Sequence, residues 1–237
     1  MSGAGAAFLR QSQALAEWAS GLAPAEWAAP SALPNWTVRD LVAHLVIVHE
    51  SLARTLGADT DGAAMPLGAY VSTYSAHAEE LERLAQDRAA SVTPAELVAR
   101  LVELREALAG PVVATAPAVL ASARGPVSRE DFLRTRVVEA TVHSDDLARS
   151  LPGRPGPALD PDALATTVGV LLEALAEQRP GSGQRVAVPG VAAVEVAGAA
   201  GDHELDPLVA LRVFTGRLDA ASLDATRTDP TWGPVLA

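Results

Sequence analysis

The fold and the chemistry of this chain both centre on the stretch Arg136-Val137-Val138-Glu139-Ala140-Thr141-Val142-His143-Ser144-Asp145-Asp146. Within it, Glu139 lies four residues before His143, and side chains with that spacing project from the same side of an α-helix. The pair would supply half of a metal site if another segment supplied a third ligand. The segment Trp36-Thr37-Val38-Arg39-Asp40-Leu41-Val42-Ala43-His44-Leu45 offers one, His44.

Length and composition predict one main domain with a smaller one attached. The chain has 237 residues, which is more than one typical domain and less than two large ones. Apolar residues make up 49% of the chain, enough for a sizeable core, but aromatic residues make up only 4%. We therefore expect closely approaching helices whose core is built from small and aliphatic side chains.

The charge and the cysteine count exclude several classes of function. A formal net charge of −11 argues against nucleic acid as a partner, because nucleic-acid binders need clustered Lys and Arg. The chain has no cysteine, so a metal must be held by histidines and carboxylates, and thiol chemistry must use a thiol from outside the protein. No charged leader or uninterrupted apolar run of about 18 residues occurs, which favours a cytoplasmic protein without a membrane partner.

Amphipathic segments with clear start and stop signals predict a mainly α fold, an up-and-down bundle of helices over about residues 1–150. Thr37 with Asp40, and Thr93 with Glu96, have the spacing of capping boxes. Gly57 and Gly110 follow the ends of these two helices. The expected helices run from about Ala4 to Leu22, Thr37 to Leu56, Pro66 to Arg88, Thr93 to Gly110 and Ser128 to Arg149.

Two histidines share the second predicted helix. His44 lies in the apolar stripe of Leu41 and Val48, so its ring is aimed at the core. The alternative to a ligand is a buried neutral ring that is hydrogen-bonded to a backbone carbonyl. His49 lies roughly 140° further around the helix, and we predict a surface or rim position for it.

On the last predicted bundle helix, a polar stripe runs beside an apolar one. Taken alone, such a stripe is most often a solvated face. However, a set of two histidines and one glutamate is a ligand set that zinc accepts in sites with an open fourth position. Asp146 is placed to orient a neighbouring ring or a bound water, and Arg136 to pair with Glu139 or Asp131. The polar stripe consists of Arg136, Glu139, His143 and Asp146.

His77, on the third predicted helix, has three possible roles. It is a half-buried polar residue, a further metal contact or acid/base group in the same cavity, or an exposed side chain. We include it with Asp146 among the residues expected around the metal ligands.

The tail predicts a small α+β unit over residues 158–237. Residues 151–157 form a linker rich in Pro and Gly, and a helix follows from Asp160-Pro161 to about Gln178. Gln184–Val188 and Val191–Val196 are expected to be short strands, and a further helix starts at Asp206-Pro207. His203 falls in a segment predicted to be a solvated loop.

The two motifs, Trp36 to Leu45 and Glu139-x-x-x-His143-x-x-Asp146, resemble those of the mycothiol-dependent maleylpyruvate isomerase family. That family is a branch of the DinB-like four-helix-bundle proteins, and the resemblance covers about residues 5–150. It implies a divalent metal, commonly zinc, held by His44, Glu139 and His143, with the remaining positions left to water, thiol or substrate. The tail looks like the sterol-carrier-like domain of the same family.

The resemblance also implies an arginine from the second domain near the cleft. Arg212 and Arg217 are the candidates, and we prefer Arg217 as a catalytic residue because the Thr215-Gly216-Arg217 turn could present it at a domain edge. A guanidinium matches the two oxygens of a substrate carboxylate. The alternative is an arginine that only complements the helix dipole.

The function implied is that of a metal-dependent enzyme, an isomerase or transferase. It would use a low-molecular-weight thiol such as mycothiol on a small electrophilic substrate, as a monomer or homodimer. One alternative is a small-molecule carrier in which the metal is structural or vestigial, since fold does not fix function. Another is a metal-dependent hydrolase, with water in place of the thiol.

Overall fold

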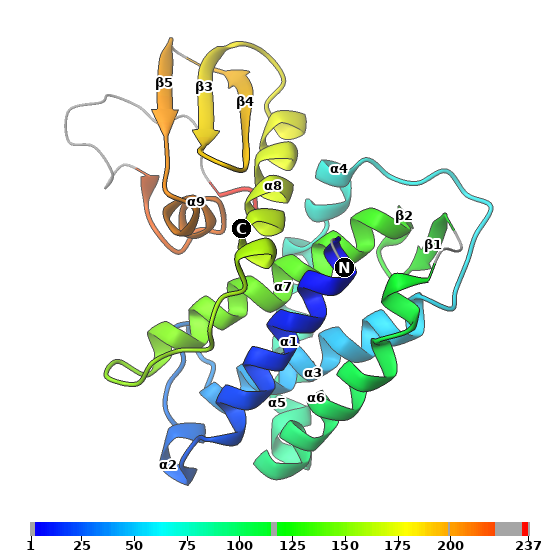
Figure 1. The fold of residues 1–237 in the computed structure, drawn as a ribbon, viewed down its shortest axis with the longest axis vertical. Coiled ribbons are helices and arrows are strands. Elements are labelled where there is room, and N and C mark those ends of the chain that lie inside the picture. Colours follow the sequence, from blue (N-terminus) through cyan, green and yellow to red (C-terminus); the bar gives the residue numbers. More distant parts are fainter. Residues whose placement is uncertain (1–2, 115–117, 199, 221–233, 237) are drawn as a thin grey trace.

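The computed structural model describes residues 3–114, 118–198, 200–220 and 234–236 of the chain. Long helices form most of it, and a small three-stranded sheet with one helix lies at the other end (Figure 1). The predicted mainly α fold with a small α+β part is therefore confirmed. Within the described ranges, no helix combines the length and apolar character needed to cross a membrane.

Four long helices form the bundle. α1 and α3 each pack against both α6 and α7, which closes a ring. Phe8 and Leu52 share one apolar cluster while Leu15 and Leu41 share another, so α1 and α3 run in opposite directions. The bounds are Ala4–Ser20 for α1, Val38–Thr55 for α3, Pro94–Leu108 for α6 and Arg129–Ser150 for α7.

The bundle helices start where their capping residues predict. The Thr37 hydroxyl accepts from the amide of Asp40 (3.2 Å), and the Asp40 carboxylate accepts from the amide of Thr37 (2.8 Å). Thr93 and Glu96 form the same reciprocal pair at the start of α6. These contacts satisfy amides that the first turn of a helix leaves without partners, and thus fix where each helix begins.

The single helix predicted from Pro66 to Arg88 is wrong. The chain instead forms α4 (Leu67–Val71), a 3-10 turn η1 (Ser75–His77) and α5 (Ala78–Ser91). The hydroxyls of Ser72 and Thr73 donate to the carbonyls of Gly68 and Tyr70, which competes with regular helical hydrogen bonding. Sequence periodicity did not reveal this local competition.

The connection before α7 contains a β-hairpin that the sequence analysis did not predict. β1 (Val119–Ser122) pairs antiparallel with β2 (Gly125–Ser128). Leu120 lies opposite Val127, and both side chains are fully buried against the bundle. The tight turn of the hairpin carries Arg124. Two short elements, α2 (Pro24–Trp27) and the 3-10 turn η2 (Pro111–Val113), also lie in segments predicted as loops.

The C-terminal part contains α8 (Pro161–Gln178), a sheet and α9 (Pro207–Phe214). β3 (Gly183–Val188) is the central strand, antiparallel to β4 (Ala192–Ala197) and parallel to β5 (Gly201–Glu204). The first two strands match the prediction. β5 was not predicted, and His203, which we placed in a loop, lies in it and is half-buried. Residues 221–233 of the predicted unit lie outside the described ranges.

α8 joins this part to the bundle. It packs against α7 and α4, and one apolar core includes Val138 and Val142 of α7 together with Leu171 of α8 and Phe214 of α9. Gly68 of α4 donates its amide to a Glu177 carboxylate oxygen at 2.7 Å, and a Cβ on that glycine would clash with the same side chain. The division into domains 1–150 and 158–237 stays a prediction.

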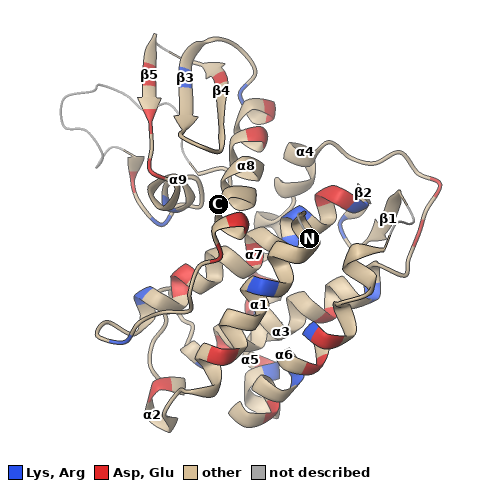
Figure 2. Cartoon of the chain, in the orientation of Figure 1, with Lys and Arg blue, Asp and Glu red and all other residues tan. Residues whose placement is uncertain are grey.

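Charged residues join the same elements at the surface. Acidic and basic residues are interspersed along the helices (Figure 2). Arg10 of α1 pairs with Asp160, which caps α8, at 2.6 Å. The ion pair links the first bundle helix to the start of the C-terminal part.

His49 is fully buried, so its predicted surface or rim position is wrong. Its Nδ1 lies 2.7 Å from the carbonyl oxygen of Leu45 and its Nε2 lies 2.8 Å from the Ser12 hydroxyl, while its ring packs 4.7 Å from that of Phe8. The face opposite His44 is covered by α1, which spacing along α3 alone did not reveal. Burial lowers the pKa of His49 from 6.5 to about 4.

This buried ring predicts a loss of stability in mild acid. Because the folded pKa lies below the unfolded one, the unfolded chain binds more protons between about pH 6.5 and 4, and the free energy of unfolding falls as pH falls through that range. Urea unfolding of the metal-free protein should show that His49 lowers the free energy of unfolding by about 2 kcal/mol between pH 7.5 and pH 5. The free energy of unfolding of H49Q should fall less over the same pH interval. An equal fall in H49Q and the wild type would contradict the lowered pKa of His49.

Candidate metal centre

Three side chains that could hold a metal ion come together between α3 and α7. His44, Glu139 and His143 each offer one ligand atom, and these atoms all lie within 4.8 Å of one another. The Nε2 atoms of both histidines lie 3.3 Å from the same oxygen, Oε2 of Glu139. The Trp36 and His44 rings pack nearly perpendicular to each other, with centroids 5.6 Å apart. The structure thus brings together the three residues that the two motifs contain.

The hydrogen bonding of His143 fixes which of its nitrogens faces the centre. Nδ1 lies 2.9 Å from Oδ2 of Asp146, a fully buried carboxylate. Because an ionised carboxylate only accepts hydrogen bonds, Nδ1 carries the ring proton. In the neutral ring, Nε2 then directs a lone pair at the Glu139 carboxylate. Two such acceptors facing each other require a proton or a cation between them.

Two of the separations are compatible with ligands that share one cation. Both Nε2 to Oε2 distances are 3.3 Å, and all three ligand atoms lie within 4.8 Å of one another. Ligands about 2.0–2.1 Å from a tetrahedral ion lie about 3.3–3.4 Å from one another. Two imidazoles and a carboxylate form a ligand set that zinc and similar ions accept. The residues present therefore fit a divalent metal.

Two opposing effects set the pKa values of His44, Glu139 and His143. Burial disfavours the charged form of each group, and the oppositely charged neighbours favour it. Burial raises the pKa of Glu139, but the adjacent His143 and His44 rings and the Arg136 guanidinium outweigh it, so the pKa lies well below its ordinary value. Burial lowers the pKa of His44 more than Glu139 raises it. For His143, burial is outweighed by Asp146 and Glu139, and the pKa is raised. The carboxylate is thus ionised and ready to bind a cation.

The polar stripe of α7 is not a solvated face. Arg136 is 3% exposed, Glu139 8% and Asp146 0%. Glu139 and Asp131 were the two predicted partners of Arg136. Arg136 approaches Glu139 at 3.9 Å, whereas Asp131 pairs with Arg134. Three fully or nearly buried charged side chains, with the partly exposed His143 in the same row, require partners or a ligand, because an isolated buried charge is costly.

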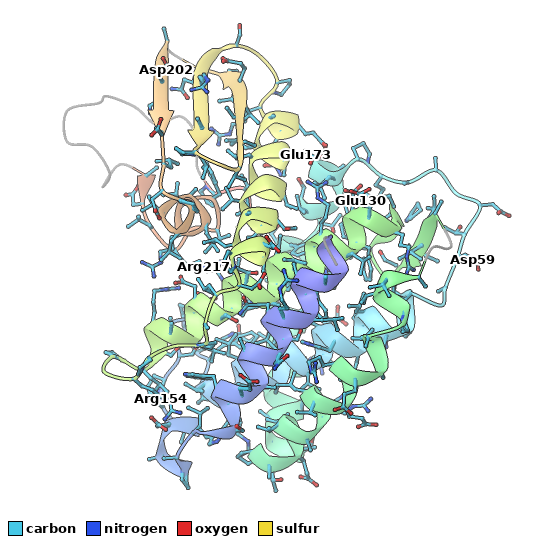
Figure 3. All side chains as sticks on the ribbon, in the orientation of Figure 1. Asp59, Glu130, Arg154, Glu173, Asp202 and Arg217 are labelled. Carbon is cyan, nitrogen blue, oxygen red and sulfur yellow. The ribbon has the colours of Figure 1, made fainter. Side chains whose placement is uncertain are left out.

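Asp146 is held by arginines as well as by His143. Arg217 donates from Nη2 to Oδ2 of Asp146 at 2.9 Å, and Arg149 donates to the other oxygen. Beside it, Arg212 of α9 forms a two-pronged pair with Asp145. Figure 3 shows Arg217 where the C-terminal elements meet α7. The arginine that we predicted to meet substrate is therefore bonded to the carboxylate that orients His143.

A cavity of about 290 Å³ opens beside His44 and Glu139. His77 lines it, is half-buried, and places Nδ1 3.0 Å from the carbonyl oxygen of Thr73. Arg124 and Arg136 also line it, whereas Arg217 does not. The sequence analysis missed Arg124 because the hairpin that carries it was not recognised.

The fold and the three-residue centre define a helical-bundle protein with a buried group able to hold a metal. Residues 8–148, more than half of the chain, match the family model described as "Mycothiol maleylpyruvate isomerase N-terminal domain". The chain belongs to this family. No curated protein sequence matches it.

Two solved structures are similar over nearly the whole chain. One is a crystal structure of the mycothiol-dependent maleylpyruvate isomerase, with a TM-score of 0.61, 16% identity, and coverage of 92% of this chain and 89% of that one. The other is a histidine-to-alanine mutant of the mycothiol-dependent maleylpyruvate isomerase, with a TM-score of 0.59, 17% identity, and coverage of 91% and 88%. At these identities the likeness shows a shared fold.

Replacing His143 with alanine should abolish stoichiometric metal binding, because it removes one of three ligands. D146N keeps all three ligands but removes the carboxylate that fixes the His143 tautomer, and should weaken metal affinity about 10- to 100-fold. Both are measured by metal analysis and by competition with a chromophoric chelator. D87N, on the exposed face of α5, serves as the control. Full metal occupancy in H143A would place the metal elsewhere.

Proposed function

We propose that the protein is a metal-dependent enzyme that uses a low-molecular-weight thiol, such as mycothiol, for isomerisation or transfer on a small electrophilic substrate. The observation that carries this proposal is the His44, Glu139 and His143 group, two members of which, His44 and Glu139, line a cavity, in a chain without cysteine. Membership of the mycothiol maleylpyruvate isomerase family supports it.

The three ligands leave room for a further one. When bound there, a divalent metal such as zinc would lower the pKa of an incoming thiol. A thiolate adds to one carbon of an activated double bond, the former double bond rotates as a single bond, and elimination restores both the double bond and the thiol. In a transfer reaction, the sulfur instead displaces a leaving group and stays on the product.

The side chains of the protein have separate tasks in this scheme. Asp146 keeps the proton of His143 on Nδ1 and leaves Nε2 as a ligand. Arg217 holds Asp146 in place from the C-terminal part. We place His77 at the cavity wall, within reach of a bound substrate rather than among the ligands. We also propose a cytoplasmic location and a sterol-carrier-like relationship for the C-terminal part.

The decisive test measures consumption of electrophiles with mycothiol, and with other small thiols, on protein loaded with zinc. We expect turnover that requires both thiol and metal, is lost with a chelator, and returns when zinc is added. H143A should lose turnover together with the metal. D87N should behave like the wild type.

The alternatives predict different results. A carrier would retain stoichiometric metal and bind small molecules, but would convert none of the electrophiles. A hydrolase would cleave its substrate without added thiol. Either outcome would replace the proposal.

Arg217 is the catalytic candidate from the sequence analysis, and its bonds to Asp146 favour an indirect role. We expect R217Q to weaken metal affinity by up to about 10-fold and to regain most of its turnover at saturating zinc. The measurement is turnover as a function of free zinc. A variant that is fully loaded with metal but inactive would show instead that Arg217 acts on the substrate.

A further inference from the structure

Two arginines in the cavity beside the metal centre have donors without partners. Arg124 comes from the β1–β2 turn and Arg136 from α7, and both line the cavity of about 290 Å³. The Nε atoms of both are buried and have no hydrogen-bond partner among the described residues. Buried donors in folded proteins are nearly always paired, so these two leave hydrogen-bonding capacity unused beside the cavity.

Tyr74 links the two guanidinium groups. Its hydroxyl accepts from Nη2 of Arg136 at 2.6 Å, and the guanidinium carbon of Arg124 lies 4.1 Å from the centre of its ring. Its own hydroxyl proton is not used in the bond from Arg136. The Phe132 ring lies on another side of Arg136, at 5.0 Å. These contacts hold both arginines in position before any ligand arrives.

The charges around the cavity favour an anion. Glu139 is the carboxylate nearest to Arg136, but at 3.9 Å it is too distant for a hydrogen bond, and it belongs to the metal ligands. Among the described residues, no carboxylate lies within 4.0 Å of Arg124. The lining includes three arginines, Arg54, Arg124 and Arg136, against two carboxylates, Glu80 and Glu139, in a chain whose net charge is −11.

We propose that Arg124 and Arg136, positioned by Tyr74, form a binding subsite for a carboxylate of the electrophilic substrate. This deepens the proposed function and rests on it, because it assigns the residues that would bind the substrate beside the metal centre. A carboxylate is planar and matches the Nε and Nη edge of a guanidinium with two parallel hydrogen bonds. The carboxylate would be held at the cavity wall, next to Glu139 and His44.

Direct binding tests the subsite without requiring turnover. Benzoate and its neutral analogue benzamide are titrated into the zinc-loaded protein and followed by calorimetry. We expect benzoate to bind at least 10-fold more tightly than benzamide, and R124Q to remove about 10-fold of the benzoate affinity. R54Q removes an exposed arginine of the same cavity, and should change the benzoate affinity by less than about twofold.

Arg136 is buried, so its conservative variant is used beside Arg124. R136K keeps the charge but loses the planar edge, and should also weaken benzoate binding. If R136K does not fold, R124Q decides. Equal binding of benzoate and benzamide, or equal losses in R54Q and R124Q, would overturn the subsite. An unchanged benzoate affinity in R124Q would also overturn the subsite, because the metal would then bind the carboxylate.

Turnover separates this inference from the proposed function. With the thiol fixed, R124Q should raise KM about 10-fold for an electrophile that has a free carboxylate, and leave KM for its methyl ester nearly unchanged. The same comparison with thiols that do and do not carry carboxylates distinguishes substrate from thiol as the source of the anion. If the wild type turns over no electrophile, the proposed function fails, and benzoate binding still decides the subsite.

Discussion

The structure depends on one buried carboxylate. Glu139 is 8% exposed, lies inside a helical bundle, and has an imidazole nitrogen 3.3 Å away on each of two helices. Burying a charge is unfavourable unless it is compensated, and here the compensation comes from groups that must approach from different parts of the chain. His44 of α3 meets this requirement from across the α3–α7 contact, and the Trp36 ring packs against His44. The same row of α7 contains Arg136 and Asp146, which are also buried, and His143, which is partly exposed.

A chain of hydrogen bonds and ion pairs leads outward from Glu139. His143 is oriented by Asp146, and Asp146 is held by Arg217 and Arg149. Arg212 and Asp145 form a second contact next to it. Since Arg212 and Arg217 belong to the C-terminal part, the geometry of the metal ligands depends on how that part docks on α7. The opposite side of Glu139 faces the cavity, where Arg136 and Tyr74 continue the polar row.

The sequence revealed the elements whose signals are local. Capping residues such as Thr37 and Thr93 fixed helix starts, and the i, i+4 spacing placed Glu139 and His143 on one side of α7. Signals that depend on a distant neighbour were missed. His49 was placed at the surface because nothing along α3 shows that Ser12 and Phe8 cover it. The predicted helix from Pro66 breaks where Ser72 and Thr73 turn their hydroxyls onto the backbone, and Arg124 became visible only once the hairpin was known.

The shared core of α7 and α8 bears on how this protein could have been assembled in evolution. The family model ends at residue 148, yet Val138 and Val142 within it belong to one apolar core with residues of α8, α9 and the sheet, and α7 packs directly against α8. A gene fragment that encoded only the matched region would leave this apolar surface of its most important helix in water. Exchange of the C-terminal part between relatives would therefore succeed only with matching changes in α7. The two parts are expected to have diverged together, as one inherited unit.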